Sequence, residues 1–115
     1  MTPKTLVLIR SNPKESHRAC EGIRIALGLA AGEHAVEVVL AGEAALLLTP
    51  DAEESVDGEM AVKFLASLKE FIPHFFVEKE NARLIDLSDS EYSIISLSSD
   101  EVAEKIADAS RFAVF

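Results

Sequence analysis

Short apolar runs alternate with segments of helical periodicity along this chain, and this alternation narrows the possible folds more than any other feature. Strands that alternate with helices form parallel sheets through right-handed crossovers, with helices on both faces. The sequence therefore predicts a three-layer α/β sandwich with a mainly parallel sheet of about five strands. The runs with the length and apolar content of strands are TLVLI at 5–9, AVEVVL at 35–40, HFFVEK at 74–79, SIISL at 93–97 and RFAVF at 111–115.

The segment after the first run carries the signals of a helix start and stop. Asn12 is expected to cap the helix, Pro13 suits its first position, and Glu15 places a carboxylate near its N-terminus. The sequence AAG, which finishes at Gly32, predicts the end of the helix. The predicted core face consists of Ala19, Ile23, Ala26, Leu27 and Ala30.

A second apolar patch lies on roughly the opposite side of this helix and consists of Gly22, Ile25 and Leu29. An isolated chain would leave such a patch in water, so it predicts contact with a partner chain. The alternative is that later segments of the same chain cover the patch.

Two more helices are expected. Residues 58–72 form the strongest amphipathic segment, and Ser98 and Glu101 make the S-x-x-E capping box of a last helix. Residues 81–92 predict a short helix or an ordered loop. The predicted core face of residues 58–72 consists of Ala61, Phe64, Leu65, Leu68, Phe71 and Ile72.

The connection between residues 40 and 58 is expected to be only partly regular. The sequence AGEAALLLTPD at 41–51 predicts a short helical stretch that Pro50 ends, and residues 51–57 predict an acidic linker.

Composition limits the partners and the compartment. The 115 residues suit one domain, residues 1–115, and a net charge of -9 disfavours nucleic acid and anionic membranes as partners. One cysteine and three scattered histidines predict no disulfide framework and no metal site. The N-terminus lacks the features of a signal peptide, and no apolar stretch approaches the roughly 20 residues of a spanning helix. We therefore expect a cytoplasmic protein.

Several enzyme classes lose support because their motifs are absent. The sequence contains no G-x-G-x-x-G fingerprint, no G-x-x-x-x-G-K-[ST] loop and no G-x-S-x-G elbow. Its acidic runs also lack the order of ligands in a calcium loop. We expect no cofactor and no metal.

Sites in open α/β sheets lie outside the carboxyl ends of the strands, so the loops of interest begin at Arg10, Ala41, Glu78 and Ser98. In the first of these loops, a helix N-terminus and nearby polar side chains could hold a small anion or a persulfide, although the same residues also suit simple helix capping. The predicted binding residues are Ser11, Asn12, Lys14 and His17 in this segment, together with Arg24 in the helix.

Cys20 is the single cysteine of the chain, so it is the one candidate for a nucleophilic thiol. His17 and Arg24, at helical spacing from it, could lower the pKa of the thiol. The alternative is a small buried hydrophobe at the edge of the core face.

The order of segments resembles the DsrE/DsrF/DsrH-like family, which includes the Tus sulfur-relay subunits. The similar residues are 6–48, LVLIRSNPKESHRACEGIRIALGLAAGEHAVEVVLAGEAALLL, in which the turn Ala41, Gly42 and Glu43 has the small and acidic character of the family. The closing residues 98–115, SSDEVAEKIADASRFAVF, resemble its final helix and strand.

The resemblance implies a flavodoxin-like sandwich that assembles into trimers or hexamers, and sulfur transfer through a cysteine persulfide. In E- and D-type subunits the sulfur-carrying cysteine lies in the loop after a central strand, which corresponds to residues 78–83, EKENAR; that loop has no cysteine here. The resemblance therefore implies a divergent member without the E-type cysteine. H-type subunits place a cysteine in the first helix, and Cys20 is similar in position.

We predict a small cytoplasmic, DsrE-like homo-oligomer, or a subunit beside related chains, that acts as a non-catalytic binding or scaffold protein associated with sulfur metabolism. One alternative is a sulfurtransferase that carries persulfide on Cys20, with His17 and Arg24 supporting the thiolate. Another is a module that binds a small anion at Ser11 and Asn12 and has no role in sulfur chemistry.

Overall fold

A five-stranded sheet forms the centre of the molecule. The computed structural model describes residues 3–79 and 85–115. The strand order is β4-β3-β2-β1-β5, and all neighbouring strands are parallel, as the sequence predicted. The strands are β1 (Lys4–Ile9), β2 (Ala35–Ala41), β3 (Phe75–Glu78), β4 (Ile94–Leu97) and β5 (Arg111–Val114).

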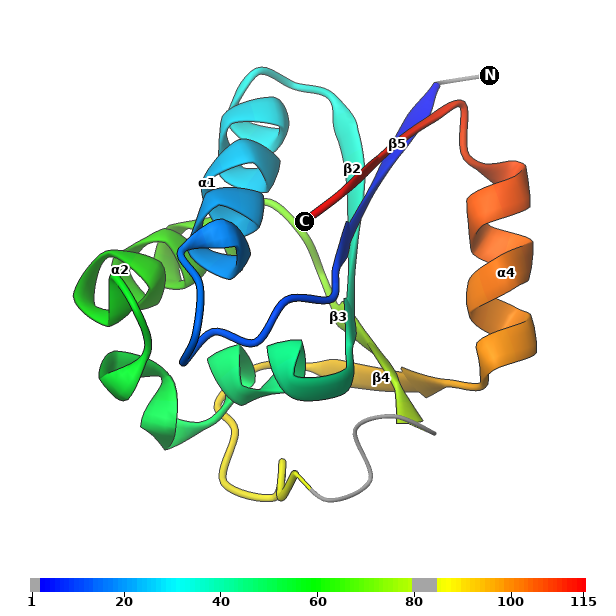
Figure 1. Cartoon of the computed structure of the whole chain (residues 1–115). Helices are drawn as coiled ribbons and strands as arrows, with labels where there is room; N and C mark the ends of the chain where they lie inside the picture. Colours follow the sequence, from blue (N-terminus) through cyan, green and yellow to red (C-terminus); the bar gives the residue numbers. More distant parts are fainter. Residues whose placement is uncertain (1–2, 80–84) are drawn as a thin grey trace.

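Helices cover both faces of this sheet and give the three predicted layers. Helices α1 (Arg18–Ala31) and α2 (Gly58–Leu68) lie on one side, and α4 (Ser99–Asp108) lies on the other (Figure 1). The fold is therefore an α/β sandwich with an all-parallel sheet, the class expected from strands that alternate with helices.

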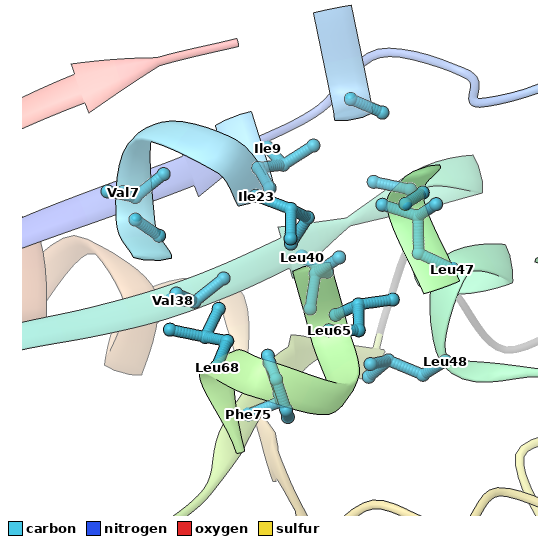
Figure 2. Packing of buried hydrophobic residues seen from close by; sticks show 14 of the residues in the cluster. Val7, Ile9, Ile23, Val38, Leu40, Leu47, Leu48, Leu65, Leu68 and Phe75 are labelled. Carbon is cyan, nitrogen blue, oxygen red and sulfur yellow. The ribbon is translucent and has the colours of Figure 1, made fainter. Parts of the chain in front are cut away.

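The thicker of the two cores lies between the sheet and the pair α1 and α2. Inward-facing residues of β1, β2 and β3 interdigitate there with leucines and isoleucines of the helices (Figure 2). Its fully buried members include Val7, Ile23, Leu40, Leu65 and Phe75. Burial of these aliphatic groups away from water is the main term that stabilises the fold.

The core on the face covered by α4 is smaller, and apolar side chains on this face remain in contact with solvent. Leu6 and Leu8 of β1 lie beneath α4 in a second core. The register of β1 with β5 pairs Leu6 with Phe112 and Leu8 with Val114, so Phe112 and Val114 point to the same face. Because α4 is the one described helix on this side, Phe112 remains 53% exposed and Val114 remains 39% exposed.

The first helix begins later than predicted. It begins at Arg18, and its N-cap residue His17 makes no capping hydrogen bond through its side chain. Asn12 instead closes a separate turn: its Oδ1 accepts from the Lys14 amide at 2.9 Å, and its carbonyl accepts from the Glu15 amide at 3.0 Å. An Asn side chain stabilises a turn with the same bonds that it uses to cap a helix, so the sequence pattern is ambiguous. The predicted end at Gly32 is confirmed.

This chain covers only part of the second apolar patch of α1. Gly22 is buried beneath Ile9 and Phe115, whereas Ile25 and Leu29 are half-buried, so contact of this patch with a partner chain stays a prediction. The predicted core face is confirmed for Ala19, Ile23, Ala26 and Ala30, which are buried, while Leu27 is half-buried against the same core.

The middle of the chain is more structured than predicted. Two 3₁₀ helices, η1 (Gly42–Leu48) and η2 (Pro50–Glu54), replace the short helix and part of the linker. Pro50 begins η2 because its fixed φ suits a first helical position. Residues 85–92 contain no regular helix or strand, and residues 81–84 lie outside the described residues.

Helix α2 buries Ala61, Leu65 and Leu68 as predicted, and Ile72 after it is also buried. Phe71 was expected in the core and is 54% exposed. The helix ends at Leu68, so the helical spacing that predicted an inward position for Phe71 no longer holds there.

The predicted capping box of α4 is present. The Ser98 hydroxyl accepts from the Glu101 amide at 3.1 Å, and a Glu101 carboxylate oxygen accepts from the Ser98 amide at 3.0 Å. Those bonds from Ser98, first through its backbone amide, lower the pKa of Glu101. The box fixes the residue at which the helix leaves β4.

Substitution of Ser98 by alanine is expected to lower the free energy of unfolding by about 1 kcal/mol, because one amide at the start of α4 loses its acceptor. Urea unfolding followed by circular dichroism measures the change. Ser67→Ala, within α2, is the control and should have no destabilising effect, since alanine is the better helix former. Equal stability of Ser98→Ala and the unmutated chain would contradict this role of the capping box.

Candidate functional site

A groove of about 540 Å³ lies at the carboxyl edge of the sheet, on the side of α4. Arg10 follows β1, Ala41 ends β2, Glu78 ends β3, and Ser99 begins α4; all four line this groove. Parallel strands place their carboxyl ends at one edge, so segments that are far apart in sequence meet there. The four loops that the sequence indicated therefore converge on one cavity.

The groove combines an apolar floor with charged groups at its edge. Leu8, Ala41 and Val102 form buried parts of the lining. The exposed side chains of Arg10 and Glu43 also line it, and neither makes a hydrogen bond or an ion pair with the described part of the chain. The arrangement offers a hydrophobic contact surface with charged groups of both signs at its margin, namely Arg10, Glu43 and Glu78.

Gly42 brings backbone to the lining of this groove. Its φ of 60° lies in the left-handed region that favours glycine, and a Cβ built on it would meet nothing within 4 Å. The open space beside Gly42 allows a ligand to approach the main chain closely.

The predicted residues of the first loop lie outside this groove. The amides of Arg10 and Ser11 both donate to the carbonyl oxygen of Phe115, at 2.7 and 3.3 Å. Asn12 uses its side chain in the turn with Lys14 described above, and Lys14 is exposed beside a different hollow that also contains Glu43. The Ser11 hydroxyl is buried without a hydrogen-bond partner in the described residues. The donors expected to hold an anion are thus largely occupied by the chain itself.

The two predicted cationic neighbours of Cys20 are exposed. His17 precedes α1, and Arg24 lies on the outer side of that helix. A neighbouring cation, Arg18, donates from its guanidinium to the Val114 carbonyl at 3.4 Å.

Cys20 lies in the core between α1 and the residues that precede α2. Its side chain is 5% exposed, and its Sγ lies 3.8 Å from the carbonyl oxygen of Asp57. Burial raises the pKa of the thiol above its ordinary value, the negative charges of Asp57 and Glu21 raise it further, and only Arg24 lowers it. A thiol in this environment stays protonated and is a poor nucleophile.

Tyr92 is a further perturbed group, at a hollow of about 240 Å³ beside η2. Burial first, and then the nearby Glu91 carboxylate, raise the pKa of Tyr92 to about 12. Its ring packs edge-on against the ring of Phe75, with 5.3 Å between the ring centroids, so Tyr92 packs at the boundary of the core.

Residues 3–79 and 85–115 contain no group of three His, Cys, Asp or Glu side chains that could hold a metal ion. No described helix is long and apolar enough to cross a membrane.

Sequence reasoning did not identify Val102, Ala103 and Ile106 as part of the groove. These residues reach it because α4 crosses the sheet from β4 at one edge to β5 at the other. Helical spacing on α4 predicts an apolar face, but it does not say which strand ends that face will meet.

The all-parallel sheet with helices on both faces defines a flavodoxin-like α/β fold. Among solved structures, the chain is similar to the ychN protein from E. coli, with a TM-score of 0.75 and 15% sequence identity. The alignment covers 99% of this chain and 100% of the ychN chain. No protein-family model matches the sequence, and no curated protein matches it significantly. At this identity the likeness shows a shared fold, which confirms the predicted fold class.

Proposed function

We propose that this chain is a non-catalytic, oligomeric subunit of the DsrE-like kind, which binds or supports partners in or near sulfur metabolism in the cytoplasm. The observation that carries the proposal is the burial of Cys20, the single cysteine of the chain, against the Asp57 carbonyl. A DsrE-type fold without an accessible thiol keeps the scaffold of a sulfur-relay subunit and lacks its sulfur carrier.

The link to sulfur metabolism draws its support from the resemblance of residues 6–48 and 98–115 to the family and from the likeness of the fold. Transfer of persulfide by Cys20 ranks lower, because the thiol is covered and its pKa is raised. Anion binding at Ser11 and Asn12 ranks lower as well, because Phe115 and Lys14 already engage that loop.

Association through the face of α4 is part of this proposal. Phe112, Val114 and Ile95 are exposed on that face, on the two sides of the second core. Parallel sheets are normally buried on both faces, and one ten-residue helix leaves these strands partly uncovered. A second copy that covers this surface would remove apolar area from water, and copies arranged in a ring would form the expected trimer or hexamer.

Phe112→Ser is expected to shift the assembly toward monomers, because it removes the largest exposed apolar group from the face of α4. Light scattering during size-exclusion chromatography, at several concentrations, gives the mass of each species. Phe71→Ser is the matched control, since Phe71 has nearly the same exposure, 54% against 53%, and follows α2 on the opposite side of the sheet. A monomeric unmutated chain, or an equal loss of mass in both variants, would refute association through this face.

A further inference from the structure

We propose that the groove at the carboxyl edge of the sheet binds a small zwitterion with an apolar body, of the kind represented by an apolar amino acid. The inference rests on the groove's lining and extends the proposed function by giving the subunit a ligand class. The volume of the groove, about 540 Å³, lies within the range of small-molecule pockets.

The apolar part of the ligand is assigned from the floor. Leu8 and Val102 belong to the core beneath α4, and the groove exposes part of that core, together with Ile106, between the strand ends and the helix. An apolar body placed there would complete the cover of this core and remove its own surface from water.

The charges of the ligand are assigned from the margin. Arg10 extends from the end of β1 and Glu43 from the first turn of η1, which follows β2. Strands β1 and β2 are neighbours, so a single small molecule can reach both side chains. Because the guanidinium and the carboxylate have no partner in the described residues, they are available for a ligand carboxylate and a ligand ammonium, respectively.

A ligand with one charge fits this margin less well. A simple anion would meet Arg10 but also the carboxylate of Glu43, in a chain of net charge -9. A simple cation would meet Arg10 as a like charge. The first turn of α4 adds no anion site, because it carries Asp100 and Glu101.

Three probes with the same phenyl body separate these possibilities: L-phenylalanine, 2-phenylethylamine and 3-phenylpropanoate. Calorimetric titration is expected to show that phenylalanine binds at least about tenfold more tightly than either singly charged probe. In Arg10→Gln, phenylalanine should bind no more tightly than 2-phenylethylamine. In Glu43→Gln, phenylalanine should bind no more tightly than 3-phenylpropanoate. Ala103→Trp, at an exposed position of α4 that lines the groove, should block all three probes.

Arg24→Gln and Glu33→Gln remove exposed charges outside the groove and should leave binding unchanged. Equal affinities for the three probes, no binding of any probe, or an unaltered preference in Arg10→Gln and Glu43→Gln would overturn the assignment. Light scattering on the same samples distinguishes the two proposals: an assembled protein that ignores phenylalanine refutes the ligand alone, and a monomer that binds phenylalanine refutes the assembly alone.

Discussion

Replacement of Phe75 by alanine is expected to lower the free energy of unfolding by about 3–5 kcal/mol. Phe75 is 2% exposed, its ring meets Tyr92 edge-on, and it belongs to the core that lies between the sheet and α2 (Figure 2). Truncation removes the ring from the core and leaves a cavity that the surrounding strands cannot close. Since domains are typically stable by roughly 5–15 kcal/mol, this loss would be visible as partial unfolding at moderate temperature.

Urea unfolding followed by circular dichroism measures the loss. Phe71→Ala is the matched control, because it makes the same chemical change at a side chain that is 54% exposed and should cost less than about 1 kcal/mol. Similar losses in the two variants would show that the core is not arranged as described.

Gly58→Ala is expected to destabilise the fold by about 1–3 kcal/mol. A Cβ on Gly58 would lie 2.6 Å from the Ala52 carbonyl oxygen and would also meet the carbonyl of Glu53. These are main-chain atoms of η2, so the contact is relieved only if η2 or the start of α2 moves. Asp57, which precedes Gly58, covers Cys20, and the movement should therefore also speed alkylation of the thiol.

Gly28→Ala is a control for which we expect the opposite change, an increase in stability. Gly28 is exposed within α1, and a Cβ there meets nothing within 4 Å, so alanine should stabilise the helix by about 0.5–1 kcal/mol. Thermal unfolding and the rate of Cys20 alkylation can be measured on the same samples. If Gly58→Ala were as stable as the unmutated chain, the close approach of η2 to α2 would be contradicted.

The sheet and its layers were predictable because short apolar runs and helical spacing are local properties of the sequence. The box formed by Ser98 and Glu101 was also predictable, since both partners lie within one helical turn. The start of α1 was not, because Asn12 makes the same kind of bond in a turn as at a helix N-cap. Ala44, Leu47 and Leu48 of η1 are buried in the core, and their spacing did not predict that this segment would be a 3₁₀ helix.

The location of the candidate site could be predicted from the sequence, but several of the residues that line it could not. The ends of β1, β2 and β3 had to share one edge once the sheet was parallel, so Arg10, Ala41 and Glu78 were expected near one another. The contribution of Val102 depends on the path of α4 across the sheet. The cover of Cys20 depends on Asp57, which lies 37 residues further along the chain.

The central claim is that Cys20 is a packing residue in an oligomeric binding or scaffold subunit. A carrier of persulfide needs a thiolate that a donor can reach, and the structure gives Cys20 a covered position and a raised pKa. The substitution Cys20→Ser provides the reference for any sulfur that attaches elsewhere.

The most direct test is the intact mass of the folded protein after incubation with a persulfide donor and removal of the excess, measured beside Cys20→Ser. We expect no added sulfur on the folded chain, and addition only after unfolding in urea exposes the thiol. A gain of one sulfur atom on the folded protein, reversed by a reductant and absent in Cys20→Ser, would contradict the account and make Cys20 a carrier.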